Sequence, residues 1–231
     1  MYLSDIHTHS IASGHGTSCT ISDMAKAASK KGLKLLGITD HGPGTLAAGT
    51  SSYFRSLTYA PKKRFGIELL FGAELNILDT EGHLDLNDEL LSELDYAIAS
   101  MHAQNYKSGT VEENTSAYLN AMRHPCVKVL GHCDNPAFPV DYETLAFGAK
   151  EYGVIFEINE ASLMPDGYRG DTRANNKEIL RCCRKLEIPI VLSSDSHGAE
   201  HVGEFTYGAE FVHEMMFPER LILNNDIPRL K

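Results

Sequence analysis

Seven short apolar segments recur along the 231-residue chain, and each of them ends in polar residues. They lie at residues 2–9, 33–41, 67–74, 94–102, 127–132, 153–159 and 188–197. Their ends follow one another at intervals of roughly thirty residues, which is the length of one strand–helix repeat. Nearly continuous apolar strands are typical of a parallel sheet that helices cover. We therefore expect an α/β fold with seven strands, one fewer than a complete eightfold barrel.

The stretches between these segments carry helix signals. We expect helices over residues 22–31, 141–152, 174–186 and 206–216. Ser22 and Asp23 are expected to cap the first helix, and Gly153 to end the second. Residues 72–86 instead predict two strands around a turn near Glu81 and Gly82. The sequence contains no low-complexity segment or Pro/Ser-rich linker, so residues 1–231 are expected to form a single domain.

Composition excludes several classes of protein. Hydrophobic residues make up 42% of the chain and charged residues 23%, which is ordinary for a globular protein and unlike a disordered or fibrous one. Apolar runs fall short of the 18 or so residues of a membrane span, and the first residues lack the features of a signal peptide. A formal net charge of −10 disfavours binding to a long nucleic acid, which needs clustered Lys and Arg.

The cysteines predict a reducing environment. There are five of them, an odd number, and no pair has the CxxC spacing. A disulfide framework is therefore not expected, and the cytoplasm is the expected location.

Histidine is the unusual residue of this chain, because most of its copies fall at the ends of the predicted strands. Seven of the 11 histidines lie at a strand end or just beyond one: His7, His9, His15, His41, His102, His132 and His197. Two carboxylates, Glu74 and Asp195, share this location. The carboxyl ends of the strands of a parallel barrel meet at one rim, where ligands bind. The sequence thus gathers nine metal-type ligands at one rim.

The spacing of these residues supports metal binding. His7 and His9 point the same way from one strand, and Asp195 and His197 repeat this arrangement on the last. Asp5 lies at an even spacing from His7 and His9, so it is expected on the same side of that strand. It is either a hydrogen-bond partner of a metal ligand or an ordinary carboxylate at a strand start. Imidazoles and carboxylates without thiolates suit zinc, manganese or iron. Nine ligands exceed the four of one tetrahedral ion, so two or three ions are implied.

Each residue alone also has a structural explanation. His41 could cap a helix, and Glu74 could be a buried carboxylate with an ordinary partner. The coincidence of all nine with strand ends is what favours a metal site. For the four other histidines, His83, His124, His201 and His213, we expect structural roles only.

The motifs that contain these residues resemble those of the PHP (polymerase and histidinol phosphatase) superfamily. They are DIHTHS at 5–10, the isolated His15, ITDHG at 38–42, GxE at 72–74, MH at 101–102, GH at 131–132 and SDSH at 194–197. The HxxNP motif at 132–136 and the EIN motif at 157–159 look most like the YcdX-like phosphatases within it. The chain departs from that subgroup at Cys133-Asp134, where a Pro-containing pair is common, and its tail is short.

The resemblance implies a distorted (βα)7 TIM-like barrel with three divalent metal ions at the carboxyl ends of the strands, zinc in the first place and manganese or iron as alternatives. By matched position, one ion takes His7, His9, Glu74 and Asp195. A second takes the bridging Glu74 with His102 and His132. The third takes His15, His41 and His197.

A site of this kind predicts hydrolysis of small phosphate esters by hydroxide that the ions generate from water. Glu74, Asp195 and His197 are then the catalytic residues, acting through the bound metals, and no covalent enzyme intermediate is expected. A small phosphorylated molecule is the expected partner, without a membrane. Asn159, Arg169 and Arg173 are the candidates for contacting it, since guanidinium groups pair with phosphate.

Four alternatives remain open at this point. Two have the same fold: a histidinol phosphatase and a 3′–5′ exonuclease-type phosphodiesterase. A third is an amidohydrolase-type barrel, which also begins with His-x-His. The fourth is a PHP scaffold without catalytic activity, although such a scaffold would be expected to lack some of the ligands.

Overall fold

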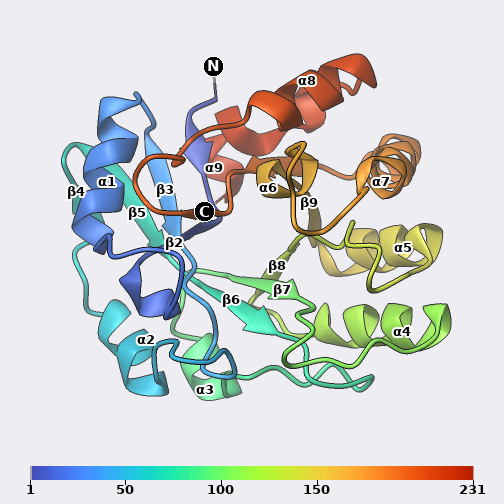
Figure 1. The fold of residues 1–231 in the computed structure, drawn as a ribbon, viewed down its shortest axis with the longest axis horizontal. Coiled ribbons are helices and arrows are strands. Elements are labelled where there is room, and N and C mark those ends of the chain that lie inside the picture. The colour runs from blue at the N-terminus through green and yellow to red at the C-terminus, as the bar shows by residue number, and fades with distance from the viewer. Residues whose placement is uncertain (1, 231) are drawn as a thin grey trace.

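A computed structural model describes residues 2–230 and shows strands at the centre with helices around them (Figure 1). The strands are β1 (Ser4–Asp5), β2 (Thr8–His9), β3 (Leu35–Ile38), β4 (Lys63–Arg64), β5 (Ile67–Phe71), β6 (Ala73–Asn76), β7 (Ala97–Ser100), β8 (Val127–Leu130), β9 (Ile155–Asn159), β10 (Ile190–Ser193) and β11 (Ser196–His197). All seven predicted strand segments are therefore present. The additional strand β4 pairs antiparallel with β5, whereas every other pair is parallel.

The strands form a ring that is interrupted three times. Their hydrogen bonds define three sheets, with the orders β1-β3-β5-β4, β10-β9-β8-β7-β6 and β11-β2. The chain passes from one sheet to another between β1 and β2, between β2 and β3, between β5 and β6, and between β10 and β11. The pair β11–β2 brings the last strand beside the first. Within residues 2–230 no continuous ladder closes the ring, so the barrel is distorted.

A small apolar cluster fills the inside of this ring. Each of the seven strand segments contributes to it, with Ile6, Leu35, Leu70, Ile98, Val129, Ile155 and Val191, and Tyr96 lies beside them. The larger core lies between the strands and the helices. The interior is thus packed at this level, as in other parallel barrels.

Helices cover the outside of the strands (Figure 1). They are α1 (Ile21–Lys30), α2 (Ser51–Leu57), α3 (Asp88–Leu91), α4 (Val111–Ala121), α5 (Tyr142–Tyr152), α6 (Glu160–Leu163), α7 (Arg173–Leu186), α8 (Thr206–Glu214) and α9 (Ile227–Leu230). Three short 3-10 helices lie at Ile11–Ser13, Glu219–Leu221 and Leu223–Asn225. Among the described residues, no helix has both the length and the apolar character of a membrane span.

Two local predictions need correction. Helix α1 is capped by Thr20, whose side chain and that of Asp23 form a reciprocal capping box, so the cap lies two residues before the predicted Ser22. The hairpin over residues 72–86 is reduced to β6 and a single antiparallel bridge between Ile77 and Leu84. The turn at Gly82 packs so closely on α4 that a Cβ atom there would lie 2.4 Å from the backbone of Ala121. By contrast, α5 begins after Asp141 and ends at Gly153 as predicted.

Candidate metal centre

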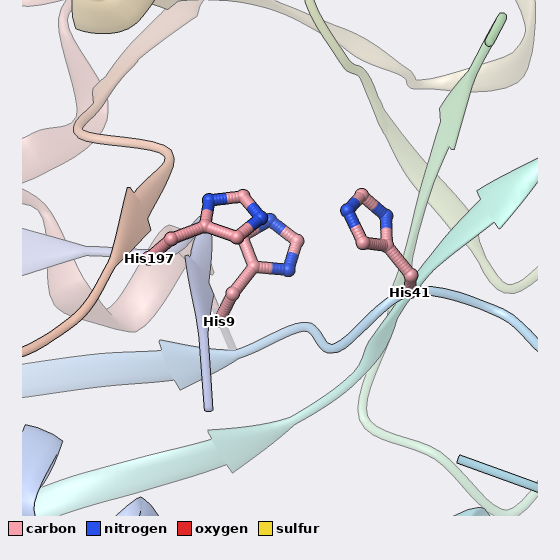
Figure 2. Close-up of side chains that lie close together, drawn as sticks. All are labelled: His9, His41 and His197. Atoms are coloured by element: carbon pink, nitrogen blue, oxygen red, sulfur yellow. The ribbon is translucent and has the colours of Figure 1, made fainter. Parts of the chain in front are cut away.

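Strand alternation carries four of the predicted ligands to the inside of the ring at one end of the barrel. Glu74 follows the interior residue Leu70 at an even spacing, and Asp195 follows Val191 in the same way. His41 and His102 stand in the same relation to Leu35 and Ile98. These side chains therefore continue the interior layer beyond the carboxyl ends of the strands. Figure 2 shows how His9, His41 and His197 lie close together although they come from distant segments.

Glu74 is the centre of this group and is fully buried. Its Oε2 atom lies 2.7 Å from Nδ1 of His41, 3.5 Å from Nε2 of His7 and 3.6 Å from Nε2 of His9. Its Oε1 atom lies 2.8 Å from Nε2 of His132 and 3.3 Å from Nε2 of His102. One carboxylate thus faces five imidazoles.

Asp195 is the second carboxylate of the group, and its two oxygens have different neighbours. Oδ1 lies 3.1 Å from Nε2 of His9 and 3.6 Å from Nε2 of His7. Oδ2 accepts hydrogen bonds from Arg169 at 2.8 Å and from Asn159 at 3.2 Å. His197, two residues further on, has its Nδ1 atom 3.1 Å from the carbonyl oxygen of Asp195.

The donor atoms fall into three overlapping sets, each compact enough to hold one ion. The sets are His7–His9–Asp195, His9–His41–His197 and His41–Glu74–His102. Within the described part of the chain, several buried atoms of these residues have no hydrogen-bond partner: Nε2 of His7, His9 and His197, Nδ1 of His41 and Oε2 of Glu74. Buried nitrogens and carboxylate oxygens that face one another unpaired are costly unless a cation lies between them. The residues therefore fit divalent metal ions of the kind that imidazole and carboxylate bind.

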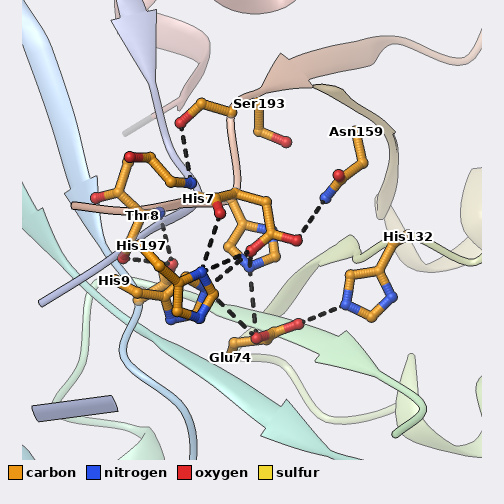
Figure 3. A network of polar contacts seen from close by, with 12 residues as sticks. His7, Thr8, His9, Glu74, His132, Asn159, Ser193 and His197 are labelled. Atoms are coloured by element: carbon orange, nitrogen blue, oxygen red, sulfur yellow. Dashed lines mark hydrogen bonds and ion pairs between the residues drawn. The ribbon is translucent and has the colours of Figure 1, made fainter. Parts of the chain in front are cut away.

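Glu157 orients His7 and His132, two of the histidines that Figure 3 labels together with Glu74. Its Oε1 atom lies 2.6 Å from Nδ1 of His7 and also accepts from the hydroxyl of Ser193. Its Oε2 atom accepts from the backbone N–H of His132 at 2.6 Å and from Asn159 at 3.0 Å. A carboxylate on Nδ1 leaves Nε2 of His7 free as a ligand atom, which is how metal-binding histidines are commonly held.

A second support lies behind His9. Its Nδ1 atom is 2.9 Å from the hydroxyl of Ser13, which donates to Asp40 at 2.7 Å. Asp40 also accepts hydrogen bonds from Ser10 and from the hydroxyl of Tyr53. Asp40, the residue before His41, thus helps to orient His9 through Ser13.

The charges in the site favour metal binding. Burial would raise the pKa of Glu74, but the facing His102, His41 and His7 hold it well below its usual range. The pKa of Asp195 is likewise held well below its usual range, against the effect of burial, by His7, His9 and Arg169.

Two imidazoles are kept neutral in the same way. Burial together with His197 and His41 keeps the pKa of His9 well below its usual range, and burial together with Arg169 lowers that of His132 to about 4. Ionised carboxylates and neutral imidazoles are the protonation states that metal ligands need. The pKa values of His7 and His41 are instead raised, against the effect of burial, because these rings face Glu157 and Glu74 respectively.

The backbone is strained at two of these positions. His132 has a φ of 27° and Asp195 a φ of 53°, in the left-handed region that non-glycine residues seldom adopt. Strain of this kind costs on the order of 1–3 kcal/mol per residue and persists where surrounding contacts enforce it. Here the Glu157 carboxylate holds the N–H of His132, and Arg169 holds the side chain of Asp195.

The other predicted residues fall into different places. His15 is exposed, but its ring lies 4.9 Å from the rings of both His41 and His197. Asp5 is buried and accepts from the hydroxyl of Ser194 at 2.6 Å and from the N–H of Gly203, so it joins the first strand to the last segments. These contacts agree with an ordinary structural carboxylate, and the link of Asp5 to a predicted ligand runs to the backbone of His7.

The three candidates for substrate contact differ from one another. Arg169 is buried at Asp195, and Asn159 bonds to Glu157, Asp195 and Arg169. Arg173 forms an exposed ion pair with Glu214 at 2.6 Å, and no contact among the described residues joins it to the cluster. The placement of Arg173 gives its prediction no support.

Sequence reasoning missed the supporting roles of Glu157, Asp40 and Ser13. Glu157 lies two residues before Asn159 on β9, so the alternation of that strand already placed both on one face. The role of Asp40 has no such signal, because it depends on the 3-10 turn at Ile11–Ser13.

Comparison with known proteins agrees with this geometry. The family model of the PHP domain matches residues 5–162. A probable phosphatase of Clostridium novyi is 40% identical over 229 residues, which cover 99% of this chain and 93% of that protein. A probable phosphatase of Thermoanaerobacter sp. is 40% identical over 98% of this chain and 92% of its own length.

Two solved structures share the fold. The putative histidinol phosphatase of Listeria monocytogenes matches with a TM-score of 0.64 at 20% identity, covering 89% of this chain and 99% of its own. The histidinol phosphate phosphatase of Lactococcus lactis, complexed with zinc, L-histidinol and phosphate, matches with a TM-score of 0.62 at 17% identity, covering 94% of this chain and 95% of its own. These likenesses confirm the distorted barrel. Because the family model and full-length relatives both match, the chain belongs to the PHP family and shares the phosphatase class of those relatives.

Proposed function

We propose that this phosphatase hydrolyses small phosphomonoesters with three divalent metal ions held by His7, His9, His15, His41, Glu74, His102, His132, Asp195 and His197. The observation that carries the proposal is the set of buried imidazole nitrogens that surround Glu74 and Asp195 without hydrogen-bond partners. Zinc is the first choice of ion, and manganese or iron would suit the same donors.

Divalent ions in such a site lower the pKa of a water molecule and offset the charge of a phosphoryl group during its transfer. The residues of the chain fix where this happens. Glu74 joins the donor sets because both of its oxygens face imidazoles. Asp195 and His197 supply ligand atoms from one strand end. We therefore assign the catalytic roles to Glu74, Asp195 and His197, acting through the ions.

Arg169 supplies a fixed positive charge beside this group. Its guanidinium is buried and bonds to Asp195, Asn159 and Ser162. The same contacts make Arg169 a residue that holds Asp195 in place, and its charge favours an anionic substrate nearby. We keep Arg169 and Asn159 as candidates for the substrate side of the site.

A cysteine nucleophile is disfavoured. Cys133, Cys182 and Cys183 are buried, and burial raises the pKa of Cys126 to about 11. Thiols of this kind are poorly ionised near neutral pH and are weak nucleophiles. We therefore propose direct attack by water, without a covalent enzyme intermediate.

The test combines metal analysis with an activity panel. The purified protein is expected to contain up to three ions per chain and to hydrolyse p-nitrophenyl phosphate. A chelator should abolish this activity, and added zinc or manganese should restore it. The panel includes histidinol phosphate, nucleoside monophosphates, bis-p-nitrophenyl phosphate, a cyclic amide and single-stranded DNA. Faster cleavage of a phosphodiester or of DNA would replace the proposal by a phosphodiesterase.

Variants locate the activity. His102→Ala and Asp195→Ala are expected to lower kcat/KM by more than about 100-fold, the upper figure for losing a mere partner of a ligand. His213→Ala is the matched control, because His213 lies exposed on α8, outside the cluster. Normal hydrolysis by the first two variants would disprove the assigned site, and an inactive wild-type protein with bound metal would favour a scaffold.

A further inference from the structure

We propose that Asp85 is a positioning residue that sets the orientation of His41 and His102 on the two sides of Glu74. The inference rests on the proposed function, since it concerns two of the proposed metal ligands. Asp85 lies in the segment between β6 and α3 and contacts neither histidine directly. It acts through Asn76 and through the loop that follows His41.

The carboxylate of Asp85 is largely buried and accepts three hydrogen bonds. Oδ1 accepts from the backbone N–H of Asn76 at 3.0 Å, and Oδ2 accepts from the Asn76 side chain at 2.5 Å. Oδ2 also accepts from the N–H of Gly44 at 2.9 Å. A carboxylate that receives three donors in this way has little freedom to move.

The first arm of the arrangement reaches His102. Because an ionised carboxylate only accepts, the Asn76 amide must turn its NH2 group toward Asp85 and its Oδ1 atom away. This Oδ1 atom lies 2.7 Å from Nδ1 of His102. Nδ1 must therefore carry a proton, so that Nε2 of His102, 3.3 Å from Glu74, is the ring nitrogen left to bind a metal. Asp85 thus selects, through Asn76, the tautomer of His102 that binds a metal.

The second arm reaches His41. The loop after this residue lies directly on the Asp85 carboxylate: a Cβ atom on Gly42 would lie 2.3 Å from either oxygen, and one on Gly44 2.9 Å from Oδ2. The N–H of Gly42 in turn donates to the carbonyl oxygen of Glu74 at 2.8 Å. The backbone around His41 is thereby fixed between Asp85 and Glu74. His41, Glu74 and His102 form one of the three donor sets.

The same segment supplies a matched control. Asp79 also accepts two hydrogen bonds, from the N–H of His83 at 3.1 Å and from its side chain at 2.7 Å. Both partners belong to the turn itself, and Asp79 and His83 are largely exposed. A carboxylate-to-amide change at Asp79 therefore alters the turn without touching either arm.

The experiment measures zinc binding to the full chain by competition with a chromogenic chelator. Asp85→Asn puts an amide NH2 group against one of the donors that Asp85 now accepts. It is expected to weaken the binding of one zinc ion roughly 10–100-fold, the range for partners of metal ligands. Asp79→Asn is expected to match the wild type. Wild-type stoichiometry and affinity in Asp85→Asn would overturn the inference. Absence of zinc binding by the wild type would instead refute the proposed function.

A spectroscopic readout separates positioning from simple support of the fold. Nitrogen-15 NMR of the metal-free wild type, recorded at a pH at which the His102 imidazole is neutral, should show the proton on Nδ1. Asp85→Asn lets the Asn76 amide turn over, so both tautomers should appear. The double variant Asn76→Asp with Asp85→Asn exchanges the amide and the carboxylate, and should restore the single tautomer while the bond to Gly44 stays lost. An unchanged tautomer in Asp85→Asn, or a double variant that still shows both, would contradict the role of Asp85.

Discussion

The two ends of the barrel contain similar residues in different arrangements. At the end opposite the metal centre, where the chain enters β7 and β8, a cavity is lined by Asp88, Leu91, Ser92, Arg123, His124, Pro125 and Cys126. His124 faces Asp88 there at 3.2 Å, in a pair whose carboxylate is 84% exposed. At the metal centre, Glu74 alone faces five imidazoles and is fully buried.

The difference shows that residue type does not identify a site. An exposed pair of one histidine and one carboxylate is satisfied by its partner and by water, and it contributes little. A buried group with more imidazoles than carboxylates leaves ligand atoms unpaired, and such atoms require a cation or a large cost in stability. The two ends differ in the burial of the carboxylate and in the number of imidazoles that face it.

The largest effect is expected at Glu74. Glu74→Ala removes the carboxylate that faces five imidazoles, so it should eliminate metal binding at more than one position. We expect a loss in kcat/KM of more than about 100-fold, above the range for losing a partner of a ligand. Metal analysis and steady-state kinetics check this. A variant that keeps all its ions would remove Glu74 from the centre of the site.

A smaller effect on metal binding is expected at Glu157, which contacts the proposed ligand His7. Glu157→Gln keeps the shape of the side chain but cannot accept from all four donors that Glu157 now binds. Affinity for the ion at His7 should fall roughly 10–100-fold. Zinc competition measures it, with Glu143→Gln as the control, because Glu143 lies exposed on α5. Equal zinc affinities of Glu157→Gln and Glu143→Gln would show that Glu157 has no influence on metal binding.

The contact between Tyr53 and Asp40, which lies furthest from His9 in its chain of hydrogen bonds, should affect metal binding less. Tyr53→Phe removes one donor to Asp40, which keeps its bonds to Ser10 and Ser13. A single hydrogen bond is worth about 0.5–1.5 kcal/mol, so zinc affinity should fall by at most about tenfold. The same competition measurement applies. A loss of zinc affinity as large as that of Glu157→Gln would mean that the hydrogen bonds of Asp40 and Ser13 pass the full effect of the change at Tyr53 on to His9.

The smallest effect is expected at the opposite end of the barrel. His124→Ala removes the contact between a partly exposed imidazole and the exposed Asp88, and should change the free energy of unfolding by less than about 1 kcal/mol. Metal content and kcat/KM should stay at wild-type values. Denaturant unfolding together with the phosphatase assay checks both. A substantial loss of activity would end the distinction between the two ends.

Strand periodicity indicated which residues would meet at the candidate site, because alternation is a local property. Glu74, His102 and Asp195 point to the interior because each lies at an even spacing from an interior residue of its own strand segment. The supporting contacts depend on loops and on packing between distant segments. Asp40 meets His9 only through the turn at Ser13, and Asp85 reaches His102 only through Asn76. Arg173 shows the converse, since its place beside the rim in sequence does not bring it to the cluster.

The left-handed backbone at His132 and Asp195 has a consequence for engineering. Glycine accepts such a conformation without steric strain, so His132→Gly and Asp195→Gly would relieve strain while they remove a proposed ligand. The metal-free protein would then lose less stability than a buried deletion normally costs. This relief offsets only part of the cost, because Asp195→Gly leaves the buried Arg169 without its ion-pair partner and His132→Gly removes a contact to Glu74.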